Sequence, residues 1–83
     1  MSNMERNEIL TKVEKIFRDV LANQSIVLAE ATTADDIEEW TSLTHVQLIS
    51  AMEKELNIKF SLREMMSWQN VGEIVNSIEK KIG

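Results

Sequence analysis

Apolar residues recur at helical spacing in three stretches of the chain. Between Ile9 and Leu21 they return every three or four positions and form a single stripe. A second stripe lies within residues 43–56, and a third lies within residues 71–82. The second stripe consists of Leu43, Val46, Leu48, Ile49, Met52 and Leu56. The pattern predicts three amphipathic helices that each turn one face towards a common core.

Asparagine residues suit the ends of the first two predicted helices. Asn3 or Asn7 would cap the start of the first helix, and Asn23 suits its C-terminal stop. Asn57 can take the left-handed conformation that ends a helix, and Ile58 after it supplies the usual hydrophobic contact. We therefore expect the second helix to run from near Thr41 to near Asn57.

Two capping signals follow the second helix. Ser61 and Glu64 have the spacing of a capping box, which predicts a short helix ending near Met66. Asn70 and Glu73 repeat that spacing and would open a fourth helix that contains the third stripe. Residues 59 and 60 would form a short extended link. No stretch has a convincing strand pattern.

A long connection, residues 23–40, separates the first two helices. We expect Ile26, Val27 and Leu28 to tuck inward and Ile37 to anchor the acidic segment around it. Long connections in small domains often carry function or wrap a bundle. The predicted fold is all-α: a four-helix bundle in a single domain, residues 1–83, with a long loop between helices one and two and a short helix three.

Composition limits the partners. The 83 residues carry a net charge of −5 and no cysteine. An acidic chain lacks the basic surface that nucleic acids or anionic membranes require, and it favours a protein partner with a basic docking patch. The chain has no apolar run long enough to span a bilayer, and its N-terminus does not resemble a signal peptide. We therefore expect a protein of the cytoplasm; a monomer is the default expectation for the predicted fold.

Ser42 is the candidate for covalent chemistry, because it lies where the acidic loop ends and the second helix begins. The first turn of a helix has unpaired N–H groups and a positive dipole end, which favour an anion such as a phosphodiester. On the local sequence alone, a simpler interpretation is favoured: Ser42 or Thr41 is only the N-cap of the helix.

Ser42 and His45 also raise the question of a hydrolase, because residues three apart share a helix face. That spacing on one helix seldom aligns a hydroxyl with an imidazole, and no oxyanion hole is evident, so we set this interpretation aside. His45 is expected to face solvent or a docking partner. With one histidine and no cysteine, the sequence predicts no metal site.

The wider pattern resembles the acyl carrier protein family. Residues 37–82 match its arrangement without gaps from Trp40 to Ile78, and residues 8–22 fit its first helix. The family opens helix two with Asp-Ser-Leu and helix four with an (Asn/Thr)-x-Val-Gly-(Asp/Glu)-like segment. The matching residues are Thr41-Ser42-Leu43, Val46, Leu48-Ile49, Met52, Leu56-Asn57-Ile58, Phe60 and Asn70-Val71-Gly72-Glu73-Ile74.

This resemblance implies a carrier rather than an enzyme. Ser42 would receive 4′-phosphopantetheine from coenzyme A on a phosphopantetheinyl transferase that uses magnesium. The thiol of that arm would hold an acyl or aminoacyl group as a thioester. Further partners would be a loading ligase and a downstream acyltransferase or synthase.

The resemblance also implies two sets of contact residues. The partner-docking face would comprise Thr41, Leu43, Val46, Gln47, Ser50, Glu53, Lys54 and Met65. The pocket that shelters an acyl chain would comprise Leu48, Met52, Phe60 and Trp68. Trp68 replaces a smaller aliphatic residue, which predicts a narrower pocket and a short or polar cargo.

Two departures from the family pattern change the expectation. Thr41 replaces the aspartate that the family uses towards the basic transferase, which predicts slower recognition. Thr44, His45 and Gln47 occupy positions that are often acidic, which favours a specialised biosynthetic pathway. The alternative is a helical interaction module with this fold that stays unmodified.

Overall fold

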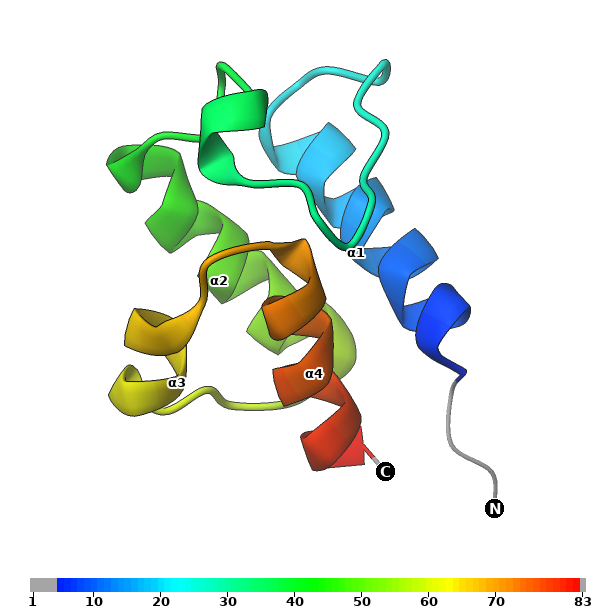
Figure 1. The fold of residues 1–83 in the computed structure, drawn as a ribbon, viewed down its shortest axis with the longest axis vertical. Helices are drawn as coiled ribbons and strands as arrows, with labels where there is room; N and C mark the ends of the chain where they lie inside the picture. The colour runs from blue at the N-terminus through cyan, green and yellow to red at the C-terminus, as the bar shows by residue number, and fades with distance from the viewer. Residues whose placement is uncertain (1–4, 83) are drawn as a thin grey trace.

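The computed structural model describes residues 5–82 and has four α-helices (Figure 1). They are α1 (Arg6–Val20), α2 (Ser42–Leu56), α3 (Leu62–Ser67) and α4 (Val71–Ile82). A single turn of 3₁₀-helix, η1 (Ala34–Asp36), lies in the connection between α1 and α2. These residues contain no strand, and none of their helices has the length and apolar character needed to cross a bilayer. The predicted all-α bundle with a long first loop and a short third helix is confirmed.

The core forms where α1 contacts both α2 and α4. Among residues 5–82, the nine largest fully buried side chains come from these three helices. They are Ile9, Val13 and Phe17 of α1, Leu48 and Met52 of α2, and Val71, Ile74, Val75 and Ile78 of α4. The predicted stripes of the first and fourth helices are therefore the buried faces. In α2 the stripe is narrower than predicted, since Leu43 is 75% and Val46 65% exposed.

The caps at the later helices follow the sequence signals. Asn57 ends α2 in the left-handed region with φ 56° and ψ 50°. Ser61 Oγ accepts from the Glu64 N–H at 3.1 Å, and the Glu64 carboxylate accepts from the Ser61 N–H at 2.8 Å. Asn70 Oδ1 accepts from the Glu73 N–H at 3.0 Å. Ser61, Glu64 and Asn70 thus satisfy backbone donors that a helix start leaves unpaired.

The ends of α1 differ from the prediction. Its N-cap is Glu5, which forms a capping box with Glu8, whereas Asn7 lies inside the helix and Asn3 lies outside the described residues. The left-handed residue after the helix is Ala22, with φ 54°, and not Asn23. The Asn23 N–H instead donates to Arg18 O at 3.0 Å, the bond that closes this type of helix end.

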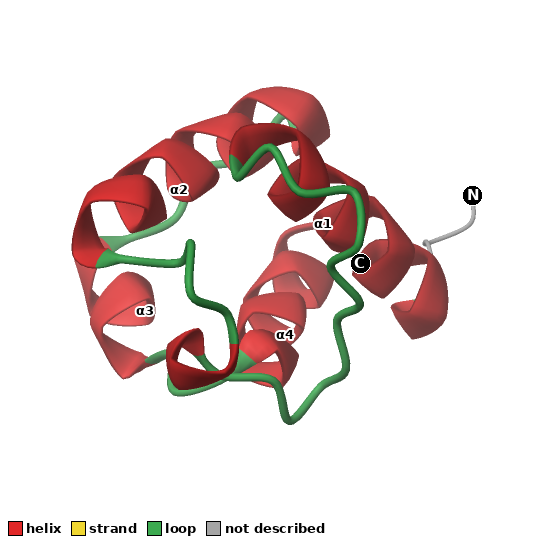
Figure 2. Ribbon diagram, turned by 90° about the horizontal axis from the view of Figure 1, so that it is seen from above, coloured by secondary structure: helices red, strands yellow, loops and turns green. Residues whose placement is uncertain are grey.

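The connection between α1 and α2 packs against the start of α4. Seen from above, it runs past the first turn of α4 before it reaches α2 (Figure 2). The N–H groups of Val71 and Gly72 donate to Thr32 O and Glu30 O at 2.9 and 2.8 Å. The close approach favours glycine, because a Cβ on Gly72 would lie in tight contact with Glu30 O, at 3.0 Å.

Two apolar residues anchor the first half of this connection. Ile26 and Leu28 are buried, but Val27 between them is 74% exposed, so the expectation that it tucks inward is wrong. This alternation of buried and exposed residues is the one expected of extended backbone, in which successive side chains point to opposite sides. Ile37 is buried as predicted. The connection therefore holds a fixed path up to the start of α2.

Candidate functional site

Ser42 is the first residue of α2, and Thr41 is the N-cap. Thr41 Oγ1 accepts from the Thr44 N–H at 3.2 Å, and Thr44 Oγ1 accepts from the Thr41 N–H at 2.8 Å. The Ser42 side chain is exposed, and within residues 5–82 its hydroxyl makes no hydrogen bond. Of the two residues considered for the cap, Thr41 therefore has that role, which leaves the Ser42 hydroxyl available.

Thr44 also fixes the loop before the helix. Its hydroxyl donates to Glu39 O at 2.8 Å, so the same oxygen joins the loop to the helix cap. No acidic residue lies in the first turn of α2. The partial positive charge at this end of α2 is therefore not neutralised by a carboxylate of its own first turn.

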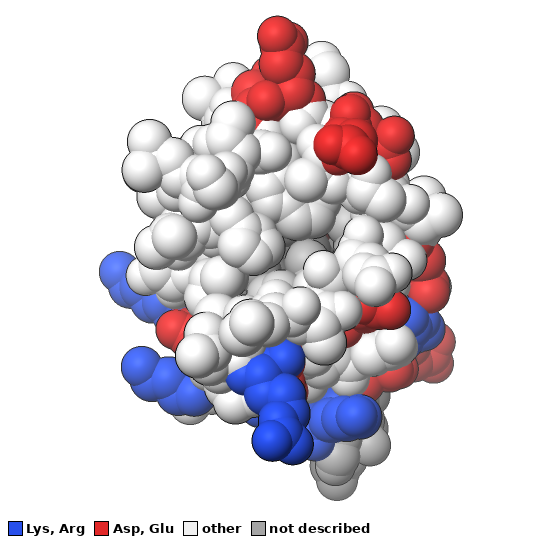
Figure 3. Space-filling model, turned by 60° about the vertical axis from the view of Figure 1, so that its left-hand side comes forward, with Lys and Arg blue, Asp and Glu red and all other residues white. Residues whose placement is uncertain are grey.

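Charge is segregated on the side of the molecule that carries α2 and α3. Figure 3 turns this side forward and shows a wide uncharged surface between acidic side chains at the top and basic side chains at the bottom. Asp35, Asp36 and Glu38 are exposed in the loop that leads to Ser42. Lys59 and Arg63 are exposed on the link and on α3. The approach to Ser42 is thus acidic, although the start of α2 is neutral.

A cavity of about 260 Å³ opens beside Ser42. Its walls come from the loop, the start of α2, the end of α3 and the start of α4. The lining residues are Ala34, Trp40, Thr41, Ser42, His45, Trp68, Gln69, Asn70 and Ile74. No Asp, Glu, Lys or Arg is among them, so a ligand there would meet aromatic, aliphatic and neutral polar groups.

An aromatic chain, defined as Phe17, Trp40, His45, Trp68 and Phe60, connects this cavity to the core. Phe17 meets Trp40 edge to face with centroids 4.8 Å apart, and Phe60 meets Trp68 in the same way at 4.8 Å. His45 lies between the two indoles, stacked with Trp40 at 6.0 Å and edge-on to Trp68 at 6.2 Å. Such aromatic contacts favour defined ring geometries. The walls of the cavity are therefore fixed by packing that reaches α1.

His45 belongs to the cavity wall and is only partly exposed, so the expectation that it faces solvent holds in part. The side chain is half-buried, and Trp40 Nε1 donates to its Nδ1 at 3.0 Å. Burial lowers the pKa of His45 below its ordinary value, which favours the neutral ring. With Nδ1 accepting, the proton lies on Nε2. No hydrogen bond joins His45 to Ser42 within the described residues, so the pair lacks the geometry of a nucleophile and its base.

The residues expected at the partner-docking face are not equally exposed. Thr41, Leu43, Val46, Gln47, Ser50 and Lys54 are exposed. The Glu53 carboxylate instead accepts from the Phe60 N–H at 2.9 Å and thereby holds the link to α3. Met65 is partly buried against the core.

The sequence reasoning omitted two exposed apolar residues of α3. Leu62 is 68% and Met66 77% exposed. The sequence did carry a signal for them: Leu62, Met65, Met66 and Trp68 lie within seven consecutive positions. A helix of six residues is too short to bury all four of these apolar side chains. With Leu43 and Val46 they make four exposed large apolar side chains on α2 and α3, which we call the apolar face.

The four residues expected to line an acyl pocket separate into two groups. Leu48, Met52 and Phe60 are core residues with at most 7% exposure. Only Trp68 lines the cavity beside Ser42. Sequence reasoning did not assign Trp40, His45, Gln69 or Ile74 to a pocket, although Trp40 directly before the Ser42 segment was a usable signal.

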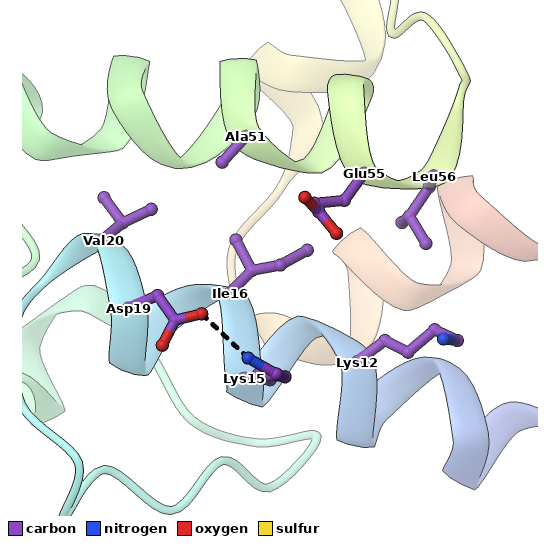
Figure 4. Close-up of a pocket in the computed structure, with 8 residues that line it drawn as sticks. All are labelled: Lys12, Lys15, Ile16, Asp19, Val20, Ala51, Glu55 and Leu56. Carbon is purple, nitrogen blue, oxygen red and sulfur yellow. Dashed lines mark hydrogen bonds and ion pairs between the residues drawn. The ribbon is translucent and has the colours of Figure 1, made fainter.

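A second pocket, of about 340 Å³, lies between α1 and α2 and shares no lining residue with the cavity beside Ser42 (Figure 4). Its apolar lining residues are Ile16, Val20, Ala51 and Leu56. Lys15, which lines this pocket, forms an ion pair at 3.1 Å with Asp19 of the same helix. No group of three or more His, Cys, Asp or Glu residues in the described chain is arranged to hold a metal ion.

Comparisons with known proteins agree with this geometry. The sequence model of a family described as the phosphopantetheine attachment site matches residues 11–78. An acyl carrier protein of Thermotoga maritima is 37% identical over 79 residues, which are 94% of this chain and 96% of that protein. An acyl carrier protein of Thermosynechococcus vestitus is 32% identical over 80 residues, which are 95% and 98% of the two chains. The solution NMR structure of a holo acyl carrier protein from Geobacter metallireducens superposes with a TM-score of 0.84 at 41% identity, covering 88% of this chain and 84% of that one.

Proposed function

The chain belongs to the acyl carrier protein family, and we propose that its Ser42 receives 4′-phosphopantetheine from coenzyme A as a covalent arm. The observation that carries this proposal is the division of roles at the start of α2. Thr41 caps the helix, and the exposed Ser42 hydroxyl makes no hydrogen bond within residues 5–82. A serine with a structural cap role would have its oxygen engaged, whereas this one is free to react.

The residues around Ser42 fit such an arm. A phosphodiester on Ser42 would lie at the N-terminus of α2, where the helix dipole favours an anion by about 0.3–1 kcal/mol. No carboxylate lies in the first turn to repel it. The cavity beside Ser42 has no charged side chain in its lining that would repel a group carried on the arm. These features support attachment at this serine.

The attachment step requires only one group from this chain, the Ser42 hydroxyl. Ser42 Oγ forms a bond to the phosphorus that carries pantetheine in coenzyme A, as that phosphorus loses its bond to the bridging pyrophosphate oxygen. The 3′-phosphoadenosine 5′-phosphate portion leaves with that oxygen, and the serine proton passes to a base of the transferase. Once attached, the arm supplies a terminal thiol on which an acyl or aminoacyl group is held as a thioester.

Partner enzymes would dock on the surface next to Ser42. The apolar face offers the side chains that protein partners bury, and Gln47 and Ser50 continue it along α2 without charge. The exposed acids of the preceding loop would attract the basic transferase. Because α2 is less acidic than is usual in carriers of fatty-acid synthesis, we assign the chain to a specialised biosynthetic pathway with its own loading ligase and synthase.

The test of this proposal is incubation with coenzyme A, magnesium and a broad-specificity phosphopantetheinyl transferase, followed by intact-mass analysis. We expect the wild-type protein to gain the mass of one phosphopantetheine group. An unrelated carrier protein in a parallel reaction shows that the enzyme is active. If that control is modified and the wild-type chain is not, even after prolonged incubation, the proposed attachment at Ser42 is wrong.

Thr41→Asp refines the same assay. An aspartate there can still cap α2 and adds a carboxylate that attracts the basic transferase, so we expect faster modification than in the wild type. The gain should shrink as salt is added, because exposed charges are screened. If only Thr41→Asp is modified, the natural chain is an unmodified interaction module.

A further inference from the structure

The cavity beside Ser42 has no charged lining, and the N–H groups of its two indoles are already engaged within the protein. Trp40 Nε1 donates to His45, and Trp68 Nε1 donates to Ser77 Oγ at 2.9 Å. Both indole N–H groups are therefore used inside the protein. Asn70 Oδ1 is occupied by the Glu73 N–H at 3.0 Å.

His45 Nε2 is the donor that remains in the aromatic wall. Within residues 5–82 the imidazole is engaged at Nδ1 only, and no buried side-chain nitrogen or oxygen is left without a partner. Nε2 is consequently accessible, and in the neutral ring it carries the proton. His45 lines a cavity whose other large walls are the two indoles.

Packed side chains also prevent the cavity from extending into the core. Trp68 is fixed by its bond to the buried Ser77 and by its contact with Phe60. Ile74, at the inner side, is 1% exposed. The volume of about 260 Å³ lies below the range of roughly 300–1,000 Å³ that is typical of small-molecule pockets. A long chain would have to displace core side chains.

We propose that this cavity holds a short, uncharged acyl group carried on Ser42, with His45 Nε2–H donating to an oxygen of that group. This inference rests on the proposed function. A carboxylated acyl group is disfavoured, because the cavity offers no cation to compensate for the lost hydration of a buried charge. The chain would therefore shelter neutral short cargo and leave anionic cargo in solvent.

A matched pair of acyl groups tests the inference. Butyryl and succinyl groups have four carbons each and differ by a carboxylate. Each is loaded onto the full chain from its coenzyme A thioester with a broad-specificity transferase, and intact mass is recorded first. The indole N–H signals of Trp40 and Trp68 are then compared by NMR with those of the protein bearing the arm alone. We expect the butyryl group to shift both signals and the succinyl group to leave them nearly unchanged.

Two variants at His45 separate the hydrogen bond from the packing. His45→Asn places an acceptor near the Nδ1 position and removes the donor at Nε2, whereas His45→Gln places an amide near Nε2. We expect the butyryl-dependent shifts to be lost in His45→Asn and retained in part in His45→Gln. The Trp40 indole signal of unloaded His45→Asn should stay near its wild-type position, which shows that the wall is intact.

The outcomes distinguish this inference from the proposed function. If the intact mass shows no arm, the proposed function has failed and the inference fails with it. If the arm and butyryl group are attached and neither indole signal moves, only the inference is overturned. Equal shifts for succinyl and butyryl groups, or full shifts in butyryl-loaded His45→Asn, would also overturn it.

Discussion

Ser42→Ala is expected to abolish attachment of the phosphopantetheine arm while leaving the fold unchanged. The substitution removes the only atom that would form the bond to phosphorus. The fold does not depend on that atom, because Thr41 and Thr44 cap α2 and the Ser42 hydroxyl is unbonded within residues 5–82. Intact mass after incubation with coenzyme A and transferase measures the loss, and a thermal melt compares the folded states.

Ser50→Ala is the matched control for that experiment. Ser50 is also exposed on α2, about two turns further along the helix. The control variant should be modified as the wild type is. An arm on Ser42→Ala would show that another hydroxyl is the attachment site, and a collapsed thermal transition would show that Ser42 has a structural role.

Phe17→Ala is expected to lower the free energy of unfolding by about 3–5 kcal/mol. Phe17 is completely buried in α1 and meets Trp40 edge to face at 4.8 Å, so its removal leaves a cavity and an unsupported indole. A domain of 83 residues is stable by roughly 4–12 kcal/mol in total, so this single substitution would remove a large part of the free energy of unfolding. Urea denaturation followed by circular dichroism measures the difference.

Phe17→Leu serves as the comparison for the stability loss, because it retains much of the apolar volume and removes the aromatic contact. We expect it to be less destabilising than Phe17→Ala. A loss below about 1 kcal/mol for Phe17→Ala would contradict the assignment of Phe17 to a well-packed core. In folded Phe17→Leu, a displaced Trp40 indole signal would show that α1 supports the cavity wall.

Much of the fold was predictable because local signals and the apolar period agree. Asn57, Ser61 and Asn70 act at helix ends as their side chains predict, since each cap depends on a few neighbouring atoms. Ala22 was not predictable in this way. An alanine takes the left-handed conformation there because the surrounding connection imposes it, with Arg18 donating to Ile26 O at 2.7 Å.

Burial on α2 was only partly predictable. Periodicity identifies the apolar residues of a helix but not how many neighbours are present to cover them. The 3.6-residue turn of the helix places Leu43 and Val46 on another side of α2 than Met52. They stay exposed, while Leu48 and Met52 are buried. The same limit explains Leu62 and Met66 on α3, which is too short to enclose both.

The site was predictable in its centre and not in its surroundings. Ser42 was identified from its place at a helix start within a longer pattern. The cavity beside it depends on Trp40, His45 and Trp68, which come from separate elements and meet only in the folded chain. No sequence spacing predicts that Trp40 Nε1 donates to His45 Nδ1. This hydrogen bond holds the imidazole in the wall of the cavity.

The central claim is that Ser42 carries the arm, and mass spectrometry of the natural protein tests it most directly. The protein is isolated from the cells that produce it, its intact mass is recorded, and the peptide that contains residues 41–46 is fragmented. We predict one phosphopantetheine group per chain, placed by the fragments on Ser42. A natural protein that carries no such group, from cells whose other carrier proteins are modified, would contradict the claim.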